Sequence, residues 1–227
     1  MEVDFNYPFR IYPITDRPKN LFIYVMVGLP GVGKTTFSQY IKESCPNGLA
    51  TIISRDEMRA QRIWENRKLS SNEQRAKNLS LDYQVTLDCL EQFNHELTIK
   101  KHRVIIFDGC HTNVKELVPL LLYIRENGEN WWKGKVILSL IFIGGPNTKT
   151  NIRLNTTRPE DYLDYKDKRG AHDSVPKRVF LKKKEQYREL QELDNLEKVL
   201  PICDFVYQVD PVLIDPDNHF FYNIKSR

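Results

Sequence analysis

The sequence predicts an α/β fold built on a mostly parallel five-stranded sheet flanked by helices. Two observations predict it. Short apolar runs alternate with segments of helical pattern, and the runs are unbroken, as strands buried on both faces by helices must be. The five predicted strands are "LFIYVMV" at 21–27, "LATIIS" at 49–54, "RVIIFD" at 103–108, "KVILSLIFIG" at 135–144 and "FVYQV" at 205–209.

Three helices between these strands have recognisable starts. Ser70 and Glu73 have the spacing of a capping box. The helix that follows has an apolar stripe of Ala76, Leu79, Tyr83, Leu87, Leu90 and Leu97. Asn113 is suited to cap the helix over 114–127. Ser174, with Pro176 just inside, predicts the start of the last long helix.

A glycine-rich motif joins the first predicted strand to the first predicted helix. Gly28, Gly33, Lys34 and Thr35 satisfy the pattern G-x-x-x-x-G-K-[ST]. Glycines let successive backbone N–H groups point at phosphate oxygens, the lysine reaches the β and γ phosphates, and the threonine hydroxyl is placed to bind Mg²⁺. The motif predicts a P-loop kinase fold and a nucleotide site at Gly28, Gly31, Val32, Gly33, Lys34, Thr35 and Thr36.

Length and composition indicate one domain with short additions. The chain has 227 residues, of which 41% are hydrophobic and 28% charged, enough to bury a substantial core. We expect an N-terminal arm at 1–20, a P-loop kinase domain at 21–210 and a C-terminal tail at 211–227. A polar, Arg-rich and Lys-rich segment at about 148–173 predicts a lid.

Three features predict a soluble, cytoplasmic protein. The N-terminus lacks the basic start and apolar core of a secretory signal, and no run of about 18 apolar residues suits a membrane helix. The four cysteines are widely spaced, which favours reduced thiols. The net charge of +4 is compatible with a polyanionic partner and equally with none.

Charged residues after the second and third strands are candidates for the acceptor site. Asp56 follows the second strand, at the sheet edge where ligands bind in this class, and a carboxylate there can take a proton from a hydroxyl. Arg59 lies one helical turn on, on the same side, and is suited to grip an acceptor phosphate. Asp108 ends the third strand, where it can hold Mg²⁺ through water or orient the acceptor.

The predicted lid carries four cations that are candidates for closing over the transferring phosphate. They are Arg153, Arg158, Lys168 and Arg169. Positive charge at this place stabilises the transition state of phosphoryl transfer, although most such cations form a solvated surface.

The motifs "GLPGVGKTT", "IISRDEMR", "VIIFDGCHTN" and "KRGAHDSVP" occur in this order. Together they resemble the kinase domain of phage-type polynucleotide 5′-kinases over roughly residues 21–193. The resemblance implies that Asp56 is the general base for the 5′-hydroxyl and that Arg59 contacts the acceptor's 3′ phosphate. It also implies that Asp108 lies in the acceptor site and that Arg169 contacts the donor phosphates.

Two departures from that family matter. The stretch "LNTTRPEDYLDYKD" between Arg153 and Lys168 is longer than the family's usual spacer, so either Arg153 or Arg158 takes the upstream lid position. The D-x-D-x-T motif of the 3′-phosphatase that bifunctional members append does not occur, and the sequence after residue 204 is too short for such a domain. We therefore expect kinase activity without 3′-phosphatase activity.

The resulting prediction is transfer of the γ-phosphate of ATP or another NTP, with Mg²⁺, to 5′-hydroxyl ends of DNA or RNA in nucleic-acid end repair. The predicted catalytic residues are Lys34, Asp56 and Arg169. Two alternatives stay open. One is a P-loop kinase of a small molecule or of a hydroxymethylated base in DNA, and the other is a toxin-like or regulatory nucleotide-binding module.

Overall fold

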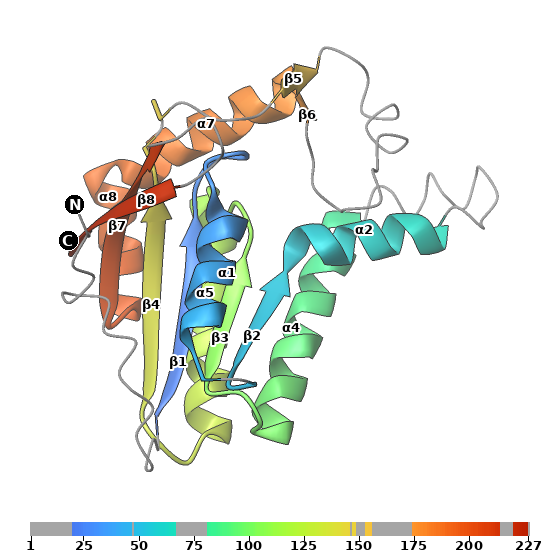
Figure 1. Ribbon diagram of the computed structural model, residues 1–227, viewed down its shortest axis with the longest axis vertical. Coiled ribbons are helices and arrows are strands. Elements are labelled where there is room, and N and C mark those ends of the chain that lie inside the picture. The colour runs from blue at the N-terminus through green and yellow to red at the C-terminus, as the bar shows by residue number, and fades with distance from the viewer. Residues whose placement is uncertain are drawn as a thin grey trace.

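The central sheet has six strands in the order β2-β3-β1-β4-β7-β8 (Figure 1). The computed structural model describes residues 20–46, 48–66, 81–145, 147–148, 153–155, 174–213 and 220–226. Five strands run parallel, which confirms the predicted α/β fold. The strands are β1 (Leu21–Val27), β2 (Ala50–Ser54), β3 (Val104–Asp108), β4 (Val136–Ile143), β7 (Phe205–Leu213) and β8 (Phe220–Ser226).

Strand β8 is an addition to the predicted sheet. It pairs antiparallel with β7, with Leu213 opposite Phe220 and Tyr207 opposite Ser226. The segment 211–227, interpreted from the sequence as a tail, thus contains the end of one strand and the whole of another. An antiparallel edge strand on an otherwise parallel sheet is common in this class of fold.

The helices cover both faces of the sheet. Figure 1 shows α1 in front of the sheet and α5 behind it, with α2 and α4 beyond the β2 edge. The helices are α1 (Lys34–Ser44), α2 (Arg55–Asn66), α4 (Leu81–Ile99), α5 (Val114–Trp131), α7 (Lys177–Gln191) and α8 (Leu193–Val199), followed by the 3₁₀ turn η1 (Leu200–Ile202). The four neighbours β2, β3, β1 and β4 end at the same edge of the sheet, because parallel strands do so.

Two short strands bracket part of the predicted lid. Strand β5 (Arg153–Asn155) pairs in parallel with β6 (Ser174–Pro176). The helix expected to start at Ser174 therefore starts at Lys177, because Ser174 to Pro176 is extended in that pair. Arg158, Lys168 and Arg169 lie outside the described residues.

The apolar stripe predicted for α4 is wrong in part. The side chains that face the core are Val85, Cys89, Phe93 and Leu97, and the Phe93 ring lies 5.4 Å from the Phe107 ring on β3. Tyr83 and Leu87 are 67% and 41% exposed. The helix is apolar over a wide arc, so apolar character alone did not identify which side faces the core. The predicted capping box at Ser70 and the first two residues of the stripe, Ala76 and Leu79, lie outside the described residues.

All four cysteines are free, as predicted from their spacing. In the described part of the chain, none of the helices combines the length and apolar character that crossing a membrane requires.

Candidate active site

The loop between β1 and α1 is shaped by three glycines. Gly31 and Gly33 have φ angles of 74° and 92°, which residues with a Cβ rarely adopt. Gly28 is constrained differently, because a Cβ there would lie 2.7 Å from the Ile143 carbonyl oxygen at the end of β4. Gly33 caps α1 without a side-chain hydrogen bond. The first N–H groups of α1 are thus available to an anion at the positive end of the helix.

Lys34 lies over this loop rather than in solvent. The side chain is buried, and its Nζ donates a hydrogen bond of 2.6 Å to the Leu29 carbonyl oxygen. Leu29 and Val32 are themselves buried and hold the loop against the domain. The ammonium group is therefore kept within the loop, where the phosphates of a nucleotide bind in P-loop proteins.

Thr35 and Asp108 come together at the end of β3. The Thr35 hydroxyl donates a hydrogen bond to the Asp108 carboxylate, with Lys34 close by. Burial raises the pKa of Asp108, and the hydrogen bond and the Lys34 charge oppose that shift. A hydroxyl and a carboxylate beside the phosphate loop are the oxygen donors that P-loop proteins use for Mg²⁺, so these two residues fit the ion. Among the described residues, no cluster of three His, Cys, Asp or Glu side chains offers another metal site.

The segment after Asp108 is fastened to the phosphate loop. The Gly28 N–H donates a 3.0 Å hydrogen bond to the Cys110 carbonyl oxygen. Next to it, His111 has a positive φ of 42°, and its ring lies so close to Gly109 that a Cβ there would be 2.7 Å from Nε2. Asn113 then accepts a hydrogen bond from Lys115 N and starts α5, as predicted. These contacts fix His111 at the carboxyl edge of the sheet.

The environment of His111 favours its neutral form. The residue as a whole keeps some exposed surface, yet desolvation of the ring lowers its pKa to about 3. The positive charges of Arg55, Lys183 and Lys34 act in the same direction. His111 therefore stands among cations as a neutral hydrogen-bonding group.

The first turn of α2 places Asp56 at the same edge. Ser54, the last residue of β2, accepts a 3.3 Å hydrogen bond from the Glu57 N–H through its hydroxyl, which caps the helix. Asp56 is exposed, and its negative charge acts on Asp108. Asp56, in the helix that follows β2, and Asp108, at the end of the neighbouring strand β3, thus lie at the same edge of the sheet.

Three arginines lie along one side of α2 at positions 55, 59 and 62, and acidic residues of α4 face them. Arg62 forms a two-pronged ion pair with Asp88, with N–O distances of 2.7 and 2.5 Å. Arg59 forms an ion pair with Asp82. Arg55 donates to the Asp82 carbonyl oxygen at 3.4 Å and lies 3.7 Å from its carboxylate. The ion pairs join α2 to α4.

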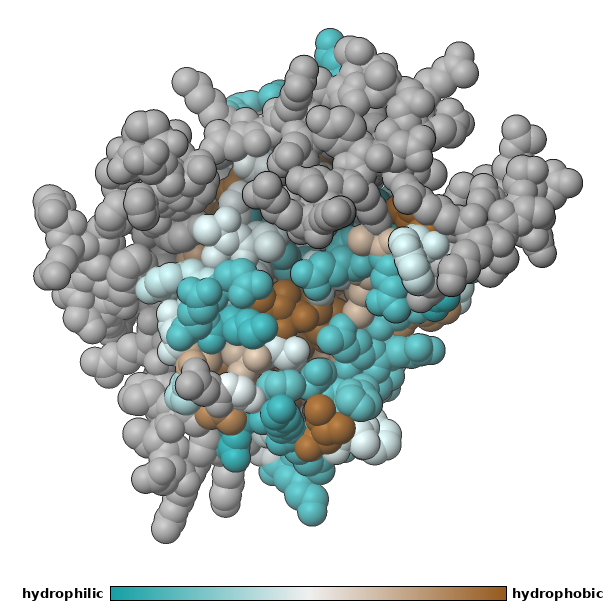
Figure 2. Space-filling model, turned by 45° about the vertical axis from the view of Figure 1, so that its right-hand side comes forward, coloured by the Kyte–Doolittle hydropathy of each residue, from teal (hydrophilic) through white to brown (hydrophobic). Residues whose placement is uncertain are grey.

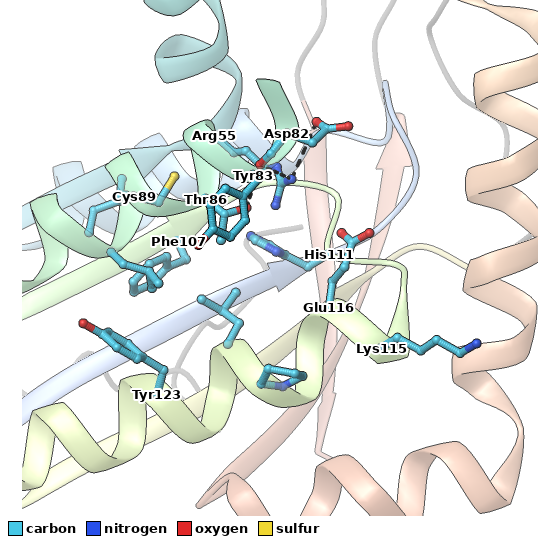
Figure 3. Close-up of a pocket in the computed structure, with 14 residues that line it drawn as sticks. Arg55, Asp82, Tyr83, Thr86, Cys89, Phe107, His111, Lys115, Glu116 and Tyr123 are labelled. Atoms are coloured by element: carbon cyan, nitrogen blue, oxygen red, sulfur yellow. Dashed lines mark hydrogen bonds and ion pairs between the residues drawn. The ribbon is translucent and has the colours of Figure 1, made fainter. Parts of the chain in front are cut away.

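A pocket of about 450 Å³ opens between β3, α4 and α5 next to these groups. Its interior is mostly apolar and its mouth is charged: Figure 3 shows Arg55 and Asp82 on one side of His111 and Glu116 on the other. The face of the molecule that carries α2 and α4 shows a small hydrophobic area enclosed by hydrophilic residues (Figure 2). The pocket is lined by Ile53, Arg55, Asp82, Tyr83, Thr86, Cys89, Leu90, Phe107, His111, Lys115, Glu116, Pro119, Leu120 and Tyr123.

Helix α7 brings one more cation to the site. Tyr187 is fully buried, stacks on Phe142 and donates a 2.6 Å hydrogen bond to the Gly144 carbonyl oxygen at the end of β4. Lys183, one turn earlier, is partly buried and close enough to His111 to affect its pKa. In the sequence it stands in a run of three lysines, which resembles a solvated helix face.

The structure gathers many of the predicted site residues. The phosphate loop, Thr35, Asp108 and Asp56 lie at one edge of the sheet. Arg59 lies on the same helix as Asp56 but is held by Asp82 and does not line the pocket. Arg153 begins β5, and the contact of any lid arginine with phosphate stays a prediction.

Sequence reasoning missed the residues that shape the pocket. Arg55 carried a signal, since it precedes Asp56 directly and begins the same helix. Tyr83 and Thr86 on α4 carried no such signal, because both lie far from any motif. Tyr83 was assigned to the apolar stripe of its helix, and Thr86 was assigned no role. His111 lies within the motif "VIIFDGCHTN" but was assigned no role from the sequence, and only the fold shows that it lines the pocket (Figure 3).

The match to a family model agrees with the fold. A family model described as an AAA domain matches residues 23–190. A solved chain from a study of the PezAT chromosomal toxin-antitoxin system of the human pathogen Streptococcus pneumoniae is similar at 15% sequence identity and a TM-score of 0.45. That match covers 85% of this chain and 68% of the other. No curated protein matches the sequence.

Proposed function

The chain belongs to this family of AAA domains, and from that premise we propose that it is an ATP-dependent polynucleotide 5′-hydroxyl kinase with Mg²⁺ as cofactor. Membership of the family supports a P-loop, kinase-like nucleotide-binding domain. The identity of the phosphate acceptor is our proposal. The observation that carries it is the position of Asp56 in the first turn of α2, where its charge acts on Asp108 and where the preceding residue, Arg55, lines a pocket that the nucleotide loop does not use.

The donor half of the proposed reaction is carried by the loop after β1. Its N–H groups and Lys34 bind the β and γ phosphates and carry the charge that develops on them. Thr35 and Asp108 would hold Mg²⁺, which when bound neutralises phosphate charge.

In the acceptor half, the Asp56 carboxylate takes the proton of the 5′-hydroxyl. The hydroxyl oxygen then forms a bond to the γ-phosphorus while the bond from that phosphorus to the β–γ bridging oxygen breaks. ADP leaves with the electron pair of that bond, and Asp56 later releases its proton to solvent. The lid arginines predicted from the sequence, with Arg169 first among them, would supply further positive charge.

A compact small-molecule alcohol is the second candidate acceptor. The pocket favours it, since a volume of about 450 Å³ is in the range of sites for single small ligands. The ion pair between Arg59 and Asp82 favours it as well, because it occupies the arginine expected to meet the acceptor phosphate.

Label transfer from γ-labelled ATP tests the proposal. The acceptors are matched DNA and RNA oligonucleotides that end in a 5′-hydroxyl or a 5′-phosphate. Label on the 5′-hydroxyl ends alone is the expected result. Binding of ATP without label on either oligonucleotide would contradict the polynucleotide acceptor.

A further inference from the structure

The three arginines of α2 have different surroundings although they lie on the same side of the helix. Arg62 and Arg59 each form a close ion pair with an acid of α4. The contacts described for Arg55 are longer, at 3.4 Å to a carbonyl oxygen and 3.7 Å to a carboxylate. Only the Arg55 side chain among the three lines the pocket. Its guanidinium is therefore the most easily redirected to a ligand.

The pocket behind Arg55 suits an uncharged ring. Aromatic and aliphatic side chains form its interior, among them Phe107, Leu120 and Tyr123. Its volume of about 450 Å³ accommodates one small-molecule-sized group and not a longer piece of polymer. Tyr83 lies at the mouth with 67% of its surface exposed, in a position to cover a bound ring.

The mouth of the pocket is polar where an acceptor's anionic group would be. Arg55, His111 and Lys115 line it together with the acids Asp82 and Glu116, and the Lys183 charge acts on the His111 imidazole. An anion there would be bound by Arg55 in exchange for its long contact with Asp82. Asp56 follows Arg55 in the first turn of α2 and points about 100° away from it around the helix, so a molecule that contacts both must span the end of the helix, with its hydroxyl at Asp56 and its anion at Arg55. A ring, an adjacent anion and a hydroxyl, in that arrangement, describe a nucleoside unit with a phosphate.

We propose that the pocket takes the terminal nucleoside of the acceptor, that Arg55 binds the phosphate next to it, and that Arg59 serves to hold α2 against α4. This inference rests on the proposed kinase function and reassigns the acceptor arginine that the resemblance implied. His111 hydrogen-bonds to the acceptor as a neutral group, and Tyr83 stacks on its base.

Steady-state kinetics of three matched variants test the arginine assignment. Arg55→Gln, Arg59→Gln and Arg62→Gln are assayed with a 5′-hydroxyl oligonucleotide, and the KM for ATP and the melting temperature are measured for each. Arg55→Gln raises the acceptor KM at least tenfold and by a larger factor than Arg59→Gln, with the KM for ATP within twofold of wild type. Arg62→Gln, which breaks an ion pair away from the pocket, leaves both KM values within twofold.

A second pair of acceptors tests the nucleoside pocket. One oligonucleotide is complete and the other lacks the base of its 5′-terminal nucleoside. Tyr83→Ala raises the KM of the complete acceptor about tenfold, the size typical of one base–aromatic stack. The same substitution leaves the abasic acceptor within twofold of wild type. An equal effect on both acceptors would overturn the stacking role of Tyr83.

The outcomes separate the inference from the proposed function. If the enzyme transfers label to oligonucleotides and Arg59→Gln weakens that transfer more than Arg55→Gln does, the inference is overturned. The proposed polynucleotide kinase function then stands. If wild type labels a free nucleoside 3′-phosphate but no oligonucleotide, and Arg55→Gln removes that activity, the inference stands. The proposal of a polynucleotide acceptor is then overturned. If wild type labels neither kind of acceptor, both are overturned.

Discussion

The two halves of the site are built by different means. The phosphate loop is one continuous stretch, shaped by glycine φ angles and by the contact of Gly28 with β4. The acceptor pocket is assembled from side chains of β3, α2, α4 and α5, which are far apart in the sequence. A local backbone motif therefore specifies the donor half, whereas the acceptor half depends on packing between helices.

Within the donor half, the largest loss is expected when the positive charge of Lys34 is removed. Lys34→Met removes the ammonium group held within the loop, and the rate of transfer falls by about 10²–10³. Lys42→Met is the control, because Lys42 is exposed in the last turn of the same helix. Single-turnover label transfer measures both. Equal rates for the two variants would contradict the assignment of Lys34.

Steric crowding tests whether the donor loop depends on close backbone contact. Gly28→Ala would place a methyl group 2.7 Å from the Ile143 carbonyl oxygen and lowers the free energy of unfolding by about 1–3 kcal/mol. Gly145→Ala is matched to it, since its Cβ meets only Thr148 Oγ1 at 3.8 Å. Urea titration of the two variants measures the difference, and similar midpoints would contradict the contact.

A substitution at the cap of α2 tests whether the acceptor half depends on the first turn of this helix. Ser54→Ala removes the hydroxyl that accepts from Glu57 N and costs about 1 kcal/mol of stability. Because the first turn carries Asp56, we also expect a lower transfer rate than in Ser44→Ala, whose hydroxyl lies at the exposed end of α1. If Ser54→Ala lowers the stability but leaves the transfer rate unchanged, the cap does not determine the placement of Asp56, and this prediction is contradicted.

The last expected effect is confined to acidic pH and is a pH dependence of stability from His111. Its pKa of about 3 is below the ordinary 6.5, so the unfolded chain binds more protons between these values. The stability linked to the neutral ring is present above pH 6.5 and is lost as pH falls toward 3. Asparagine tolerates the positive φ, so His111→Asn is a suitable probe.

Thermal melts of wild type and His111→Asn between pH 4 and 7.5 measure this effect. Burial raises the pKa of Asp108, which contributes with the opposite sign in both proteins. The comparison isolates the histidine, and the melting temperature of wild type relative to the variant decreases toward pH 4. A constant difference across the range would contradict a neutral His111.

Much of the fold was predictable because its signals are local. Unbroken apolar runs identified β1 to β4 and the start of β7, and Asn113 identified the start of α5. Strand β8 was not predicted, because the formation of an antiparallel edge strand depends on pairing with its neighbour β7 more than on its own apolar run. The side of α4 that faces the core depends on packing against Phe107, which no spacing in the helix specifies.

The site divides in the same manner. Gly33, Lys34, Thr35 and the two strand-end carboxylates could be found from the sequence, because a motif or a strand end marks each of them. The partner of Arg59 could not, since Asp82 lies 23 residues away on another helix. The expected role of Arg59 came from its spacing to Asp56 and from resemblance, and its ion pair with Asp82 is the reason why we propose Arg55 instead.

The central claim is that Asp56 takes the proton of a 5′-hydroxyl at the shared edge of the two halves. The most direct test is label transfer from γ-labelled ATP to a 5′-hydroxyl oligonucleotide by wild type and Asp56→Asn, with ATP affinity measured in parallel. The account predicts that Asp56→Asn binds ATP as wild type does and transfers label about 10²–10⁴-fold more slowly. Transfer by Asp56→Asn at a rate near that of wild type would contradict it.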